Sequence, residues 1–260
     1  MKFLGKLLVV TSLVGLAACD SGTTVNTPPA ATPPPPAITK VQVLHGSPDA
    51  PAVNVLVDGG EVLSAVDYKT GSGQLSLDEG TYSIQVDGIL PGGNAAVIGP
   101  VDLAFDGDTI YTIAAVNEVS AIEPVIISQP DTPVAAGAAR LFVLHGSAAA
   151  PQVDVFVTTP GADLAASAPV GTFSFKETIG PAEVAAGDYQ IRVTAAGDPA
   201  AVVYDSGTVT LNDGDDLTLA ALPNTKSGPA AVNLVALTGA GSAEILDAST
   251  PARLQIVHAS

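Results

Sequence analysis

One short segment brings together the residue types that hydrolases use for nucleophilic catalysis. It runs His45-Gly46-Ser47-Pro48-Asp49-Ala50-Pro51 and holds a histidine, a serine and an aspartate. Because residues i and i+2 of a strand share a face, the imidazole of His45 and the hydroxyl of Ser47 could touch. A catalytic triad also needs an open pocket and an oxyanion hole. The segment therefore allows a hydrolase as a remote alternative.

A second copy of the segment favours a structural role. His145 and Ser147 recur 100 residues later, but residues 148 and 149 are alanines, so the acid is missing. Histidine and serine side chains often bond to turn backbone, which would fix the exit of a strand. We therefore predict a structural turn motif, no catalytic residue and no enzyme. The motif comprises His45, Ser47, Asp49, His145, Ser147 and His258.

Metal ligands are sparse in this chain. One histidine per copy does not supply a zinc site. Calcium needs six to eight oxygen ligands, and the acidic stretches at 106–108 and 212–216 lack the spacing of the best-known calcium loop. An Asp-Gly pair between two apolar runs is typical of a hairpin turn. We expect no cofactor, and the weak calcium candidates are Asp106, Asp108, Asp213, Asp215 and Asp216.

The elements that must position these residues are duplicated. Val41–Ser47 matches Leu141–Ser147, and residues 79–86 match 186–193 at a larger offset of 107. The difference predicts a seven-residue insertion in the second copy, near residues 159–163. Matched landmarks in the same order indicate an internal repeat.

Each copy consists of short, β-branched, alternating segments separated by glycine, proline, aspartate and asparagine. This pattern predicts an all-β protein of tandem, immunoglobulin-like antiparallel β-sandwiches. Tyr82 and Tyr189 each lie two residues after a glycine, near the start of a matched segment. We predict that both form tyrosine corners, in which the hydroxyl bonds to upstream backbone.

The amino terminus carries features of a secretory signal. Lys2 and Lys6 precede an apolar run that ends in Leu16-Ala17-Ala18-Cys19. This ending resembles the bacterial lipobox, which implies lipidation of Cys19 and removal of residues 1–18. The run is too short to span a bilayer. Residues 19–37 are proline-rich and predict an extended tether.

The composition of the chain limits which molecules it could bind and which covalent links it could form. Removal of Lys2 and Lys6 with residues 1–18 changes the formal charge from −17 to −19. Such a surface repels nucleic acid. Cys19 is the single cysteine, so no disulfide can form within the chain.

The segments His45–Pro51 and Val53-Asn54-Val55 resemble the bacterial and archaeal family called domain of unknown function 4397, as do His145, Ser147 and residues 153–155. The second copy departs from the family pattern at Ala148-Ala149. The resemblance covers nearly everything from residue 38 onward. It implies a fold and a cell-surface context, and no activity.

These observations predict a non-enzymatic lipoprotein of the cell envelope with a structural, adhesive or protein-interaction role. The alternative is a ligand- or polysaccharide-binding surface module, for which dependence on calcium stays open. Its partners would be a membrane, reached through the lipid anchor, and a surface protein or polysaccharide; the choice between inner and outer membrane stays open. The predicted divisions are a signal peptide (1–18), a linker (19–37), two sandwiches (38–132 and 138–250) and an incomplete third repeat (252–260).

Overall fold

The computed structural model describes residues 34–251. The signal peptide, Cys19, most of the linker, His258 and the incomplete third repeat lie outside the described residues. From Pro36 onward, the described chain belongs to one compact unit.

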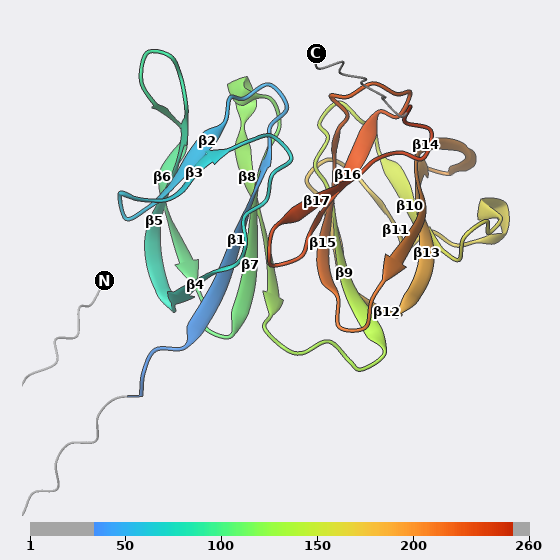
Figure 1. Ribbon diagram of the computed structural model, residues 1–260, viewed down its shortest axis with the longest axis horizontal. Coiled ribbons are helices and arrows are strands. Elements are labelled where there is room, and N and C mark those ends of the chain that lie inside the picture. Colours follow the sequence, from blue (N-terminus) through green and yellow to red (C-terminus); the bar gives the residue numbers. More distant parts are fainter. Residues whose placement is uncertain (1–33, 252–260) are drawn as a thin grey trace, which may run out of the picture. The chain divides into compact units, whose positions relative to one another are not determined.

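This unit contains two groups of strands, seen side by side in Figure 1. The first module ends at Pro130 and the second begins at Ala138. The first contains β1 (Ile38–Gly46), β2 (Val53–Val57), β3 (Gly60–Val66), β4 (Leu75–Asp78), β5 (Gly80–Gly88), β6 (Ala95–Phe105), β7 (Thr109–Val116), a 3-10 turn η1 (Val119–Ala121) and β8 (Glu123–Pro130).

The second module repeats this plan with one further strand. It contains β9 (Ala138–His145), β10 (Val153–Thr158), a 3-10 turn η2 (Leu164–Ala166), β11 (Gly171–Phe173), β12 (Thr178–Ala185), β13 (Gly187–Ala195), β14 (Asp198–Leu211), β15 (Asp216–Pro223), β16 (Val232–Leu237) and β17 (Ser242–Ile245). The predicted insertion near 159–163 falls between β10 and η2, where Asp163 caps η2 by accepting a hydrogen bond from the Ala165 N–H.

Each module has two sheets. We call β4-β1-β7-β8 and β12-β9-β15-β16-β17 the inner sheets, and β3-β2-β5-β6 and β11-β10-β13-β14 the outer sheets. The prediction of antiparallel sheets is wrong for one pair in each module, because β1 pairs with β7, and β9 with β15, in parallel. A parallel pair needs a long crossover connection. The intervening strands, most of which form the outer sheet, supply it in each module. The predicted immunoglobulin-like connectivity stays a prediction.

Turn chemistry explains how the chain changes direction. Asp58 and Gly59, with φ of 50° and 77°, form the two-residue hairpin between β2 and β3. The Asp-Gly stretches at 106–108 and 213–215 do not form hairpins, contrary to the sequence expectation. Each instead carries the chain from an outer sheet to an inner sheet.

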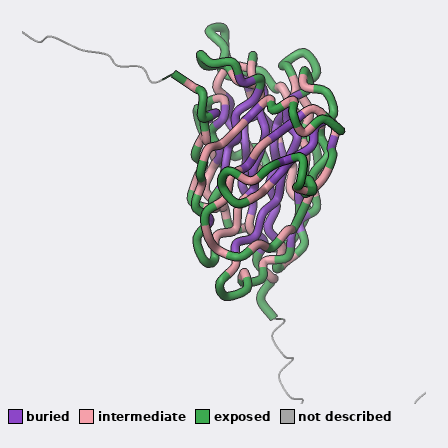
Figure 2. The backbone as a smooth tube through the Cα atoms, turned by 90° about the vertical axis from the view of Figure 1, so that its right-hand side faces the viewer, coloured by how far each residue is buried: buried purple, intermediate pink, exposed green. Residues whose placement is uncertain are grey.

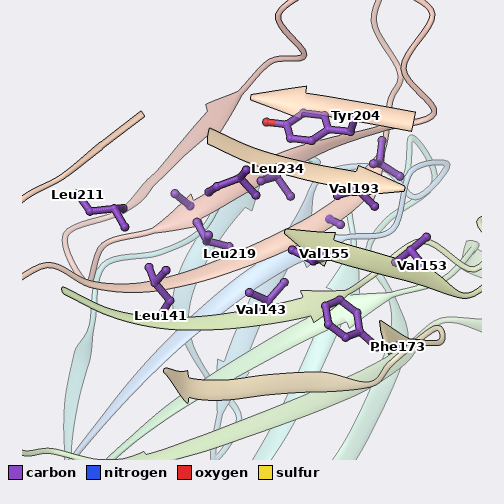
Figure 3. Packing of buried hydrophobic residues seen from close by; sticks show 14 of the residues in the cluster. Leu141, Val143, Val153, Val155, Phe173, Val193, Tyr204, Leu211, Leu219 and Leu234 are labelled. Carbon is purple, nitrogen blue, oxygen red and sulfur yellow. The ribbon is translucent and has the colours of Figure 1, made fainter. Parts of the chain in front are cut away.

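The cores lie between the sheets of each module. In the second module, apolar side chains from both sheets form one buried cluster (Figure 3). The first module has two smaller clusters, one around Phe105 and Tyr111 and one around Val53 and Val55. Buried segments run through the interior, while the loops are exposed (Figure 2).

A further apolar cluster joins the modules. It contains buried residues from both inner sheets: Leu44, Ala114, Val116, Ile127, Phe142, Leu144, Ala220, Leu222, Val235 and Leu237. The inner sheets therefore pack against each other. As a result, side chains on both faces of these sheets are buried along most of β1, β7, β9, β15 and β16.

Candidate functional site

The imidazole of His45 lies at the end of β1 and is fully buried. Its Nδ1 accepts a hydrogen bond from the Ser47 N–H at 3.3 Å, and its Nε2 lies 3.0 Å from the carbonyl oxygen of Pro51. Because Nδ1 accepts, Nε2 carries the proton and donates to that carbonyl. The ring thus ties the strand end to the turn that follows.

The second module repeats this geometry. His145 Nδ1 accepts from the Ser147 N–H at 3.4 Å, and Nε2 lies 3.2 Å from Pro151 O. Burial lowers the pKa of His45 below its ordinary value of 6.5. The Pro51 hydrogen bond and the charge of Asp67 act in the opposite direction, but the effect of burial is larger. The His45 imidazole is therefore neutral, and both of its nitrogens are engaged by main-chain atoms.

The serine and aspartate of the first turn contact each other. The Ser47 hydroxyl donates to Asp49 Oδ1 at 3.5 Å, and the same oxygen accepts the Val119 N–H at 2.7 Å. Asp49 therefore links the turn to η1. The three residues lie together, but the serine hydroxyl faces the carboxylate and the imidazole faces the backbone. This is a turn-stabilising arrangement.

The acidic candidates of the second module are engaged in local contacts. Asp216 forms a two-point ion pair with Arg140, with Nη2–Oδ2 and Nε–Oδ1 distances of 2.5 and 3.1 Å. Asp213 accepts the Gly137 N–H at 2.6 Å, and Asp215 accepts the Asn212 N–H at 2.7 Å. These carboxylates stabilise the connections to β9 and β15.

The first module places its candidates in the equivalent connection. The Asp106 N–H donates to the Tyr111 hydroxyl at 3.1 Å, and the backbone of Asp108 bonds to Ile38 and Asp131. Among residues 34–251, no group of three or more histidine, cysteine, aspartate or glutamate side chains could hold a metal ion.

Both predicted corner tyrosines lie at the start of a strand in an outer sheet. The Tyr82 hydroxyl donates to Asp78 O at 2.9 Å, and the Tyr189 hydroxyl donates to Ala185 O at 2.8 Å. Each bond reaches four residues upstream. Each hydroxyl therefore ties a β-strand of an outer sheet to the strand before it, which belongs to the inner sheet.

Sequence reasoning missed the polar contacts between the modules. Lys69 Nζ lies 2.7 Å from Glu244 Oε1, and both side chains are largely buried. Lys226 bonds the other oxygen of Glu244, and Asn233 bonds Oε1. Burial raises the pKa of Glu244, but hydrogen bonds from Lys226, Lys69 and Asn233 outweigh this and hold its pKa at about 2.

Further bonds surround this ion pair. The Tyr68 hydroxyl donates to Pro223 O at 2.7 Å, and the Gly71 N–H donates to Ser242 Oγ at 2.7 Å. No sequence signal marked these residues, since each partner lies about 155–175 positions away. Together they fix the edge of the apolar contact between the inner sheets.

A cavity of about 190 Å³ lies between the two sheets of the second module. Its walls are almost entirely apolar, and the turn residues His145 and Ser147 line one end. Sequence reasoning missed this cavity because inward-facing apolar positions predict a filled core.

Within the described part of the chain, no helix is long and apolar enough to cross a membrane. The profile of a family described as "Domain of unknown function (DUF4397)" matches residues 39–156 and 157–260. The division between the two matches falls inside β10, whereas hydrogen bonding places all of β10 in the second module.

No curated protein matches the chain. One similar solved structure is described as a "putative adhesin from Bacteroides ovatus". It is 11% identical, the match covers 80% of this chain and 94% of that chain, and the TM-score is 0.21. A likeness at this level carries no argument about what this chain does.

Proposed function

Because this chain belongs to the family described as domain of unknown function DUF4397, we propose a role from its own residues. It is a non-enzymatic, lipid-anchored protein of the bacterial envelope that presents two fused β-sandwich modules as a structural or adhesive unit. The observation that carries this proposal is the apolar core shared by the two inner sheets.

The shared core supports a structural role because it joins the two modules through one continuous apolar contact. Residues from β1, β7 and β8 pack against residues from β9, β15 and β16, and the bonds of Lys69 and Tyr68 flank them. Two modules joined only by a linker would move independently. Modules that share a core would instead hold the loops at their ends in constant positions, which favours recognition of an extended surface.

The amino-terminal residues support the anchoring. Lipidation of Cys19 by more than one acyl chain would make attachment stable, whereas a single chain would be marginal. The proline-rich residues 19–37 would then hold the modules up to roughly 50–60 Å from the lipid. Residue types at the front of the chain, the lipobox-like ending above all, carry this part of the proposal.

The histidine geometry supports a non-enzymatic role. A general base needs a ring nitrogen within reach of the proton that it removes. The nitrogens of His45 and His145 instead bond to the backbone of their own turns. In the second module, alanine replaces the aspartate that a triad would need.

The anchor is tested by growing cells on alkyne-tagged palmitate and fractionating them. We expect the full-length chain to carry the label and to sediment with membranes. A Cys19→Ala variant should lose the label. An unlabelled wild-type chain in the soluble fraction would overturn the anchoring.

The structural or adhesive role is tested on cells that display the full chain. We expect such cells to adhere to plates coated with envelope proteins or polysaccharides, and cells that carry Cys19→Ala to adhere less. The non-enzymatic part is tested with ester, glycan and peptide substrates. Turnover by wild type that disappears in both Ser47→Ala and Ser147→Ala would contradict it.

A further inference from the structure

We propose that the second module binds a small, neutral, largely apolar molecule in the cavity between its sheets. This activity goes beyond the structural role. The walls come from both sheets, with Val143, Leu219 and Leu234 on the inner sheet facing Val155, Phe173 and Val193 on the outer sheet (Figure 3). Each of these six side chains is buried.

The cavity reaches the surface at the end that holds the His145 turn. Ala149 and Pro151 of this turn line the cavity and are exposed, as is Ala231 from the loop before β16. The other end is closed by buried side chains of the core. A ligand would therefore enter between the His145 turn and the loop 224–231.

At the corresponding end, the first module has a hydrogen bond that the second module lacks. There, Asp49 accepts the Val119 N–H at 2.7 Å and connects the His45 turn to the loop between β7 and β8. The second module has Ala149 at the matching position and cannot form this bond. Its loop 224–231 instead bonds across its own base, from the Asn224 N–H to Ala231 O at 2.9 Å.

The alanine at position 149 also leaves Ser147 without the hydrogen-bond partner that Ser47 has. The Ser47 hydroxyl donates to Asp49, but Ala149 offers Ser147 no acceptor. Within residues 34–251, the Ser147 hydroxyl makes no hydrogen bond, and the residue lines the cavity while only 2% exposed. It therefore provides one hydrogen-bonding group at the mouth of an apolar cavity.

The lining defines the chemistry of the ligand. No charged side chain lines the cavity, and both nitrogens of His145 are engaged by its own turn. An ion would lose its hydration without compensation. A cavity of about 150 Å³ lined by aliphatic and aromatic side chains binds benzene. A volume of about 190 Å³ therefore suits one ring that carries one small polar group.

The test uses phenol as the probe, benzene as the comparator, and the folded unit within the full-length chain. We expect both compounds to raise the melting temperature. We also expect both to shift the methyl NMR signals of Val143, Val155 and Leu234, while the signals of the first module stay unchanged. The absence of a melting shift at saturating phenol and benzene would overturn the proposal, as would shifts confined to the first module.

Three variants sharpen the test. Ser147→Ala should weaken phenol binding about three- to tenfold and leave benzene binding unchanged, because one hydrogen bond is lost. Ser47→Ala is the matched control and should change neither. Ala221→Leu should fill part of the cavity and abolish binding of both probes. If that variant does not fold, the Ser147→Ala and Ser47→Ala comparison decides. Equal loss of phenol binding in both serine variants would contradict the assigned site.

Discussion

The histidines of the repeated turn act through their positions in the hydrogen-bond network. Each ring accepts from the backbone N–H two residues on and donates to the backbone carbonyl six residues on. The N–H groups of Ser47 and Ser147 belong to buried residues and would otherwise lack a protein partner, which costs free energy. The histidines that suggested catalysis thus tie the ends of β1 and β9 to the turns that follow them.

Replacing His45 tests this role. We expect His45→Phe to lower the free energy of unfolding by about 1–3 kcal/mol, because it leaves the Ser47 N–H and the Pro51 carbonyl unpaired. The pKa of His45 lies below 6.5 in the folded chain, so the unfolded chain takes up a proton first as the pH falls. Wild type should therefore lose stability below pH 6.5, and His45→Phe should lose less. Urea unfolding on both sides of that pH measures the difference; equal slopes would contradict it.

The residue types of the turn predicted which side chains would lie together, but not which hydrogen-bond partners each would have. His45, Ser47 and Asp49 do lie together, as their spacing requires. The link from Asp49 to Val119 joins residues 70 positions apart, so no local pattern could reveal it. Ala149, one of the residues that line the cavity, lies among several alanines in the sequence and gave no signal of it.

At the scale of elements, the sequence predicted strands more reliably than their pairing. The all-β class and the duplicated modules were predictable from alternation and repeats. The parallel pairs β1–β7 and β9–β15 were not. Alternation reports which faces are buried and carries no information about strand direction. Continuous apolar runs such as Leu141–Leu144 were the available signal that both faces are buried.

The glycine of the repeated turn is explained by close packing of strands. A Cβ atom on Gly46 would lie 2.9 Å from the carbonyl oxygen of Ala115 on the neighbouring strand β7 and 3.1 Å from Leu222 of the other module. Gly146 packs against the same Leu222. We expect Gly46→Ala to cost about 1–3 kcal/mol by overpacking. Gly92→Ala, where a Cβ meets nothing within 4 Å, is the control and should change little. Equal melting temperatures for the two variants would contradict this.

At the scale of the whole molecule, the contact between inner sheets makes the two modules interdependent. Alone, each inner sheet would expose an apolar second face to water, which is unfavourable. The repeat pattern alone could not predict this, because tandem sandwiches on a flexible linker have the same period. The structure therefore implies cooperative unfolding of both modules.

A charge placed in the shared core tests this interdependence. Leu144 is fully buried there, and Leu144→Asp should cost about 3 kcal/mol or more because the carboxylate has no partner. Wild type should unfold in one calorimetric transition, whereas the variant should show two. Val62→Asp, on an exposed position of β3, is the control and should keep one transition. Two separate transitions in wild type would show that the modules are independent.

The ion pair between the modules should make the stability of the protein decrease at acid pH. The pKa of Glu244 is about 2 in the folded chain and ordinarily 4.5. Its contribution to stability is therefore complete above pH 4.5 and is lost as the pH falls from 4.5 towards 2. Wild type should lose more stability across this window than Glu244→Gln does. The exposed Glu118→Gln is the control and should follow wild type.

Variants that remove one or both charges of the Lys69–Glu244 pair distinguish two quantities. One is the net contribution of the ion pair to stability, and the other is the cost of leaving a single buried charge unpaired. Glu244→Leu leaves the Lys69 ammonium buried without its carboxylate, which should cost about 3–5 kcal/mol. Lys69→Met combined with Glu244→Leu removes both charges and should recover most of that loss, because two apolar side chains pack where two desolvated ions were. The apolar core between the inner sheets would then hold the modules together without the pair. Chemical denaturation of the three proteins measures this. If the double variant were as unstable as Glu244→Leu, the contact between the modules would depend on the ion pair more than on the apolar core.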